Sequence, residues 1–186
     1  MEAIGFLELN SIAKGIRVAD VVLKTANVKL LSARASCPGK YYLLFAGEVG
    51  AVQASLNMGT DVGGEHVVDH CLIARIHPQV IRAINMCSMP KTMQSIGVME
   101  FFSATASIYS ADSAIKSSAV ELVDVRLGTG IGGKSFVILT GELAAVTEAV
   151  NNGIATPNAE GMLISSVVIP SPSQELLESH SVPNYK

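Results

Sequence analysis

The chain contains the same sequence unit twice. When residues 4–34 are shifted by 92 positions, 11 of the 31 positions are identical, where average amino-acid usage predicts about two. The identical pairs are Ile4/Ile96, Gly5/Gly97, Glu8/Glu100, Ser11/Ser103, Ile16/Ile108, Ala19/Ala111, Asp20/Asp112, Lys24/Lys116, Val28/Val120, Leu30/Leu122 and Arg34/Arg126. Beyond Lys40 a shift of 94 aligns the copies, so the second copy has two extra residues before Lys134. The duplication predicts two similar domains, residues 1–88 and 95–186, of the kind that pack as pseudo-symmetric partners.

Each copy has the same pattern of strands and helices. Residues 3–9 form a strand-like run, and Ser11 is a suitable N-cap for a helix whose apolar residues recur at helical spacing up to about Asn27. The later elements of the first copy are predicted as strands over 28–35 and 41–46, a helix to about Gly59, a strand over 67–76 and a short helix over 79–84. The second copy repeats the strands near 95–101, 120–127, 135–139 and 163–169. The order β-α-β-β-α-β predicts an α+β fold of two tandem ferredoxin-like domains, each an antiparallel sheet with helices packed on one face.

The composition limits the classes of partner. Charged residues make up 16% of the 186 residues, against about 25% in an average soluble protein, which suggests that other subunits cover much of the surface. No apolar run approaches the roughly 18 residues of a membrane span, and Glu2 and Glu8 lie where a signal peptide would be basic and apolar. The net charge of −3 and the absence of Trp argue against nucleic acid. We therefore predict a soluble intracellular protein. The polar tail, residues 171–186, is predicted to be peripheral and partly flexible.

One apparent catalytic motif is rejected. Residues 128–135 match G-x-x-x-x-G-K-[ST], the pattern of a phosphate-binding P-loop. A P-loop needs a following helix whose N–H groups face the phosphates, but the residues after Lys134 are β-branched and aromatic, as are those after Lys40. Each loop is therefore predicted to join two strands, with glycines that let several backbones approach closely. No catalytic nucleophile, base and orienting acid can be grouped, so an enzyme is not expected.

The three cysteines form no CxxC pair and no even disulfide set. In a reducing cytosol such residues are commonly small buried hydrophobes. Cys71, inside an apolar run, is the strongest candidate for burial.

Six segments resemble the shell proteins of bacterial microcompartments, and together they span nearly the whole chain. They are Ile4–Glu8, Ala19–Val28, Gly47–Val52, Ile96–Glu100, Ala111–Val120 and Gly141–Leu143. Two such domains in one chain resemble the tandem-domain type. This resemblance implies a homotrimer shaped like the hexamer of single-domain relatives, other shell proteins as partners, and a place in the shell of a cytoplasmic microcompartment.

The segment Ser36–Lys40 is similar to that of the tandem shell proteins of propanediol-utilisation compartments. In those proteins the corresponding cysteine holds an iron–sulfur cluster at the central pore. The resemblance implies that Cys37 is a metal ligand. It also implies a pore lined by residues of both loops, namely Ser36, Pro38, Gly39, Lys40, Gly130, Ile131 and Gly132.

A threefold axis would turn one cysteine per chain into a site. If the first loop lines such an axis, three copies of Cys37 converge as thiolates, the usual ligands of iron–sulfur clusters. We expect a 4Fe–4S cluster with three cysteine ligands from three chains, its last ligand coming from elsewhere. The cluster would carry electrons across the shell or be delivered to enzymes inside, with a redox partner in the lumen or cytosol. The alternatives are an open metabolite pore lined by Cys37, a buried Cys37, and a free tandem ferredoxin-like regulator that binds a small ligand.

The sequence leaves two alternative roles for each of four lysines. Lys40 and Lys134 either offset the charge of the cluster and its thiolates or are solvated at a strand start. Lys24 and Lys116 occupy the position where family members contact the neighbouring tile, or they complement the helix dipole at solvent. Family members often carry Arg-Pro-His near the end of the domain, whereas the corresponding residues here, 76–78 and 169–172, lack the arginine.

Overall fold

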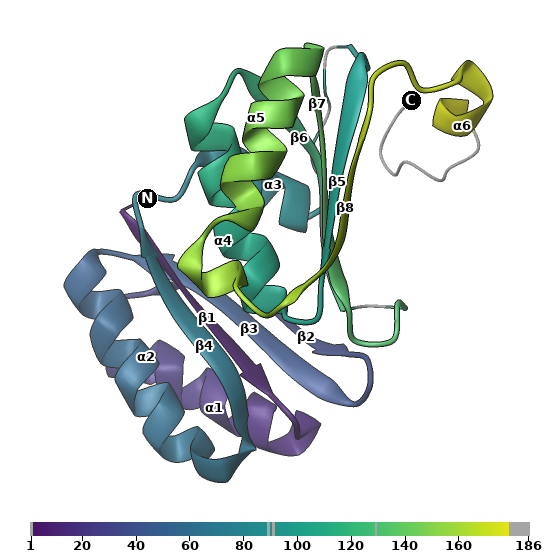
Figure 1. The fold of residues 1–186 in the computed structure, drawn as a ribbon. Coiled ribbons are helices and arrows are strands. Elements are labelled where there is room, and N and C mark those ends of the chain that lie inside the picture. Colours follow the sequence, from purple (N-terminus) through teal and green to yellow (C-terminus); the bar gives the residue numbers. More distant parts are fainter. Residues whose placement is uncertain (1, 89, 91, 129, 179–186) are drawn as a thin grey trace. The chain divides into compact units, whose positions relative to one another are not determined.

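Both copies of the repeat fold into the same four-stranded unit (Figure 1). The computed structural model describes residues 2–88, 90, 92–128 and 130–178. The chain divides after Ile76 into two compact units; the predicted first domain, residues 1–88, extends past this point. None of the described helices is long and apolar enough to cross a membrane.

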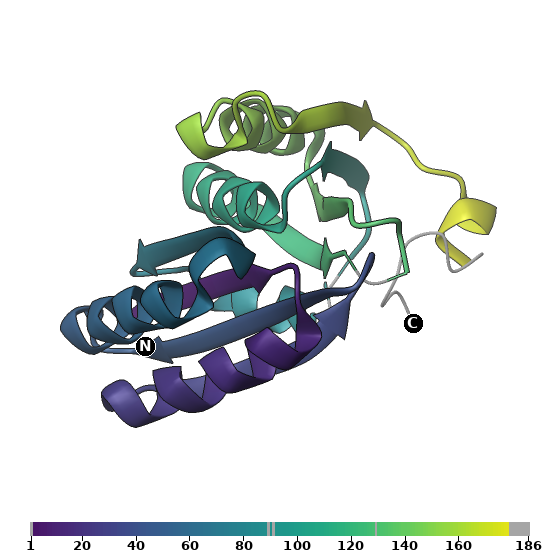
Figure 2. The same ribbon diagram turned by 90° about the horizontal axis from the view of Figure 1, so that it is seen from below.

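The first unit has the strand order β2-β3-β1-β4, all antiparallel. Its elements are β1 (Ala3–Leu9), α1 (Ile12–Thr25), β2 (Lys29–Ser36), β3 (Lys40–Gly47), α2 (Val49–Gly63), a 3₁₀ turn (Gly64–His66) and β4 (Val67–Ala74). Apolar residues of α1 and α2, among them Val18 and Leu56, pack with Leu7 and Leu43 of the sheet. Figure 2 shows both helices lying along the strands.

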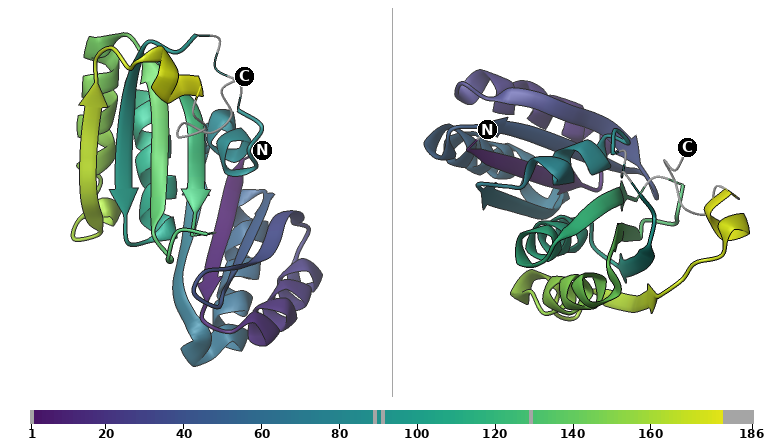
Figure 3. Two further views of the ribbon diagram at one scale, coloured as in Figure 1. Left: turned by 90° about the vertical axis from the view of Figure 1, so that its right-hand side faces the viewer. Right: turned by 90° about the horizontal axis from the view of Figure 1, so that it is seen from above.

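The second unit repeats this order as β6-β7-β5-β8. Its elements are α3 (Pro78–Ile84), β5 (Ser95–Phe101), α4 (Ala104–Ser117), β6 (Val120–Leu127), β7 (Ser135–Gly141), α5 (Leu143–Ile154), a 3₁₀ turn (Pro157–Ala159), β8 (Leu163–Ile169) and α6 (Gln174–Glu178). Helices α4 and α5 cover one face of the sheet, and α6 lies on the other (Figure 3). The predicted α+β fold of two tandem domains is confirmed.

The strand pairing makes the two copies structurally equivalent residue by residue. Leu9 pairs with Tyr41 as Phe101 pairs with Ser135. A bulge follows Leu30 in β2 and another follows Leu122 in β6, at the same position of the repeat. The backbone groups that point out of the free edge are therefore the same in both sheets.

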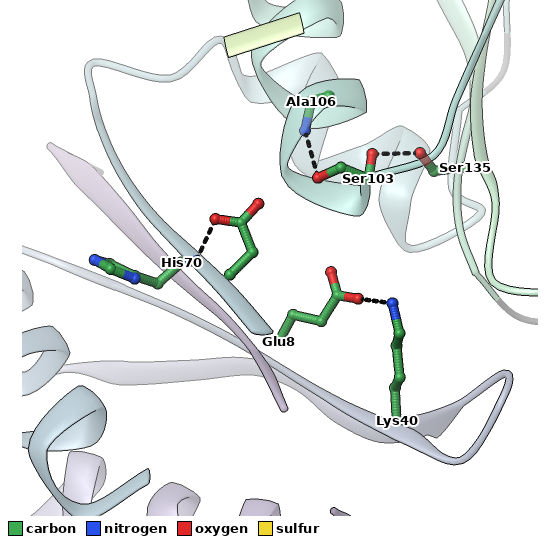
Figure 4. Close-up of polar contacts among 7 residues, drawn as sticks. Glu8, Lys40, His70, Ser103, Ala106 and Ser135 are labelled. Carbon is green, nitrogen blue, oxygen red and sulfur yellow. Dashed lines mark hydrogen bonds and ion pairs between the residues drawn. The ribbon is translucent and has the colours of Figure 1, made fainter. Parts of the chain in front are cut away.

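Helices α1 and α4, which are equivalent in the repeat, each begin at a serine cap, as predicted for Ser11. The Ser11 hydroxyl accepts a hydrogen bond from the Lys14 N–H, and the Ser103 hydroxyl accepts one from the Ala106 N–H, both at 3.3 Å. Strand β7 adds a second contact at the start of α4, because the Ser135 hydroxyl donates to the Ser103 carbonyl at 2.6 Å (Figure 4). These caps satisfy N–H groups that the helix leaves without an internal partner.

The differences from the sequence prediction include the end of α2, the end of β4 and the tail. Helix α2 continues past Gly59 to Gly63, because Gly59 is a close-packing position rather than an end: a Cβ there would lie 2.8 Å from side-chain atoms of Leu7 and of Val22. Strand β4 ends at Ala74 rather than at residue 76. The tail contains helix α6, which was not predicted, and Leu177 of this helix packs in a cluster with residues of the sheet, including Ile96. Residues 179–186 lie outside the described part of the chain.

Candidate functional site

The candidate site is the tip of the β2–β3 hairpin. Ser36 and Lys40 are paired across the two strands, which leaves Cys37, Pro38 and Gly39 as the turn. Gly39 has a φ of +81°, a conformation that favours glycine. Ser36 is buried, Cys37 is half-buried, and Pro38 and Gly39 are exposed. The turn therefore carries its thiol at the tip of the β2–β3 hairpin.

A buried ion pair lies at the base of this turn. The Lys40 ammonium binds the carboxylate of Glu8 on β1 (Figure 4). Burial raises the pKa of Glu8, and the neighbouring Lys40 partly opposes this shift. Burial, followed by the nearby charge of Glu8, raises the pKa of Tyr42 to about 12. The Tyr42 ring also packs edge-on against Phe6, with the ring centroids 5.4 Å apart.

The corresponding loop of the second unit has a different construction. It runs between Leu127 and Ser135 and holds Gly128, Gly130, Gly132 and Gly133 at positive φ. β7 follows it immediately, so the prediction of a strand in place of a P-loop helix is confirmed. Lys134 binds Glu100 at 3.1 Å, and both side chains are partly exposed. Ile131 is half-buried, while Gly130 and Gly132 are exposed.

Sequence reasoning missed the two lysine–glutamate pairs. The sequence predicts that Lys40 and Lys134 either offset the charge of a cluster and its thiolates or are solvated, but Lys40 is bound to Glu8 of β1 and Lys134 to Glu100 of β5. The signal was present, because Glu8, Glu100 and both lysines recur at equivalent positions of the repeat. The register of β1 with β3, and that of β5 with β7, was needed to bring the two pairs together.

The three cysteines lie in three different environments. Cys71, on β4 opposite Phe6, is buried as predicted, and burial raises the pKa of its thiol. Cys87 is exposed, and its thiol donates to the Asn85 carbonyl at 3.3 Å. Among the described residues, no three His, Cys, Asp or Glu side chains are grouped so that they could hold a metal ion.

The two lysines assigned to the tile edge occupy equivalent positions with unequal exposure. Lys24 forms an ion pair with Asp20 at 2.7 Å, and both side chains are exposed. Lys116 pairs with Asp112, which is buried and also accepts a hydrogen bond from the His77 N–H at 2.8 Å. Each lysine lies in the last turn of its helix, where a cation also complements the helix dipole.

Comparison with known proteins gives consistent matches to both units. The model of the BMC domain matches residues 3–76 and again residues 95–172. The bacterial microcompartment shell protein PduT of Citrobacter freundii is 40% identical over 175 residues, which are 94% of this chain and 95% of that protein. The carboxysome assembly protein CcmO of a Synechococcus strain is 25% identical over 192 residues, covering 95% of this chain and 68% of that protein.

Two solved structures have the same fold. The crystal structure of a microcompartment protein from Desulfitobacterium hafniense DCB superposes with a TM-score of 0.89 at 45% identity, covering 96% of this chain and 99% of that one. A fused permuted hexameric shell protein of the RMM microcompartment superposes with a TM-score of 0.61 at 28% identity, covering 82% of this chain and 79% of that one. The chain therefore belongs to the BMC-domain family and is a tandem-domain shell protein of bacterial microcompartments.

Proposed function

We propose that three copies of this chain form a pseudohexameric tile whose centre holds a 4Fe–4S cluster on three Cys37 thiolates. The role is structural and redox-active rather than catalytic. The observation that carries the proposal is the difference between the two loops: one hairpin tip bears a half-buried cysteine, and its counterpart is a glycine-rich loop. Two like domains per chain place six domains in a trimer, but only three of them bear the thiol.

The residues around Cys37 fit this role. Thiolates are the usual protein ligands of iron–sulfur clusters, and three from symmetry-related chains leave one iron to an external ligand. The pairing of Ser36 with Lys40 and the positive φ of Gly39 fix the turn that carries the thiol. The carboxylate of Glu8 compensates the charge of Lys40, so the base of the turn is an ion pair rather than an isolated cation. When bound, the cluster would supply one-electron redox chemistry.

The pore and the partners follow from the same arrangement. Around the axis, the Cys37 turn would alternate with the loop of Gly130, Ile131 and Gly132. Other shell proteins would meet the tile at its rim, where exposed Lys24 is available. A redox partner would reach the cluster from the lumen or the cytosol.

Purification without oxygen tests the proposal directly. We expect the wild-type trimer to be coloured, to contain about four iron and four sulfide per three chains, and to give an electron paramagnetic resonance signal on reduction. Cys37→Ser should be a colourless trimer. Cys87→Ser, which changes an exposed cysteine outside both loops, should keep the full iron content.

Two other results would overturn parts of the proposal. A colourless wild-type trimer would exclude the cluster and favour a tile with an open metabolite pore lined by Cys37. A wild-type monomer at all concentrations would exclude the trimer. To separate electron transfer from delivery, the reduced tile is mixed with an apo-ferredoxin: iron found on the acceptor indicates delivery, and iron retained through repeated redox cycles indicates electron transfer.

A further inference from the structure

Helix α3 covers the free edge of the second sheet. Strand β6 is the outer strand of that sheet, and α3 packs against it. The Leu122 N–H donates to the side-chain oxygen of Gln79 at 3.1 Å, and the Ser88 hydroxyl donates to the Leu122 carbonyl. Leu122 is fully buried. The outward-pointing N–H and carbonyl of Leu122 are thus both bonded by the segment that follows β4.

Strand β2 is the equivalent edge of the first sheet, but it is exposed. Leu30 is the repeat partner of Leu122, and its exposed fraction is 39% against 0% for Leu122. The bulge lies at the same place in both strands, so the N–H and carbonyl of Leu30 point out of the sheet edge as those of Leu122 do. An exposed edge strand of this kind is a site for pairing or covering by another segment.

Helix α6 is the repeat equivalent of α3. Ile73 and Ile169 pair with Ile4 and Ile96 at the same place in the two sheets, which sets a shift of 96 residues for this part of the repeat. Under this shift the first residue of α3 corresponds to the first residue of α6, although α6 has five residues and α3 has seven. The two helices therefore begin at equivalent positions of the repeat, although within the chain α3 packs on β6 and α6 packs through Leu177 on its own sheet.

The two pairs of elements also differ in matched charges. Gln79 of α3 corresponds to Glu175 of α6, and Glu121 of β6 corresponds to Lys29 of β2. Helix α3 thus has an uncharged amide where α6 has a carboxylate, and β6 has an acid where β2 has a lysine. Glu175 and Lys29 are both exposed in the chain. Opposite charges at a subunit contact favour the correct partner over others.

We propose that α6 of one copy covers the β2 edge of a second copy, as α3 covers β6 within the chain. In this contact Glu175 faces Lys29 and accepts from the backbone N–H of Leu30. The contact is heterologous, because a helix of one copy meets a strand of the next, and three such contacts close a ring. This inference rests on the trimer proposed above and identifies the surfaces that hold it together.

Charge reversal tests the contact. Lys29→Glu and Glu175→Lys should each raise the protein concentration at which half of the trimer dissociates by at least about tenfold. In the double variant this concentration should return to within about threefold of the wild-type value. Sedimentation velocity over a dilution series measures both effects. Glu148→Lys on α5 is the matched control, since it makes the same charge change at another exposed position, and should leave the trimer unchanged.

Cross-linking gives a second readout that does not depend on affinity. In a Cys37→Ser, Cys87→Ser background, Leu30→Cys combined with Glu175→Cys should oxidise to covalent dimers and trimers, and either change alone should not. A disulfide within one chain, or single reversals as stable as wild type in a trimeric protein, would overturn the α6 contact alone. A monomeric wild type would overturn the trimer itself and the contact with it.

Discussion

At the scale of single residues, the same ion pair occurs twice in unlike environments. The side chains of Glu8 and Lys40 are 2% and 22% exposed, whereas those of Glu100 and Lys134 are 34% and 47% exposed. A buried carboxylate depends on its partner because water cannot replace the lost contact. A partly exposed pair is screened by solvent and contributes little. The exposed pair is therefore a control, within the same chain, for the effect of burial on the contribution of the other pair to stability.

Removing each lysine in turn should reveal this difference. We expect Lys40→Met to lower the free energy of unfolding by about 3 kcal/mol, because it leaves the Glu8 carboxylate buried without its cation. Lys134→Met should cost less than about 1 kcal/mol, because Glu100 remains in contact with water. Urea denaturation at pH 7 measures both. Equal losses would show that the Glu8 pair is no more dependent on burial than its exposed counterpart.

The Lys40→Met variant should also have a characteristic pH dependence. Burial already raises the pKa of Glu8 above its ordinary value of 4.5, and removal of Lys40 raises it further. The folded state then binds a proton that the unfolded state has lost, so stability rises as the pH falls through the raised pKa towards 4.5. Adding Glu8→Gln should abolish this pH dependence. A variant that instead loses stability over this interval would contradict the assignment.

At the scale of elements, the copies have diverged in pairs of facing positions. In the first unit Gly15 of α1 lies against the buried Tyr41 of β3, and a Cβ at Gly15 would come within 2.4 Å of the tyrosine ring. In the second unit the equivalent helix and strand positions are Ser107 and Ser135, both buried. A small helix residue thus faces a large strand residue in one copy, and two small residues occupy the equivalent positions in the other.

This pairing predicts coupled effects on stability. Gly15→Ala should destabilise the protein by about 2 kcal/mol through overpacking, even though alanine favours the helix by about 1 kcal/mol. In a Tyr41→Ser background the same change should cost much less, which a double-mutant cycle measures. Gly50→Ala on α2 is the control, since a Cβ there meets no atom within 4 Å. A large loss at Gly50, or additive effects of Gly15 and Tyr41, would contradict the packing argument.

The elements also show which parts of the fold are readable from sequence. Helix α1 was predictable because its apolar spacing and its Ser11 cap are local signals. The end of α2 was not, because Gly59 looks like a terminator until Leu7 and Val22 are seen against it. Helix α6 has only five residues and packs through Leu177 on the sheet, so its stability comes from contacts distant in sequence.

The candidate site likewise has one part that the sequence predicts and one part that it does not. A short turn around Pro38 and Gly39 follows from their residue types. The partner of Lys40 could not be assigned without the register that places β1 beside β3.

At the scale of the whole molecule, duplication lets a ring of six like domains have two kinds of position. Identical domains around a sixfold axis must present the same loop six times. A chain with two unlike loops presents each of them three times, so one cysteine per chain gives three converging thiols rather than six. In the proposed tile each chain would supply one thiol to the cluster, because only Cys37 of its three cysteines lies at the hairpin tip. The cluster and the assembly must then be thermodynamically linked.

This linkage gives a prediction about the intact tile. A ligand that binds only the assembled state stabilises that state. We therefore expect the cluster-containing trimer to resist dilution further than the same protein after anaerobic removal of iron with a chelator. Cys37→Ser should dissociate at the same concentration as the iron-free wild type. In Cys87→Ser, removal of the iron should weaken the trimer as much as it does in the wild type.

The coupling between cluster binding and trimer assembly acts equally in both directions, so weakening the trimer should also weaken binding of the cluster. Lys29→Glu, which is expected to weaken the trimer, should also lower the iron retained at a given protein concentration, although residue 29 lies outside the cysteine turn. Sedimentation velocity with iron analysis of each fraction follows both quantities together. If removal of iron leaves the dissociation of the trimer unchanged, the iron is held within single chains, and a cluster shared by three copies of Cys37 is excluded.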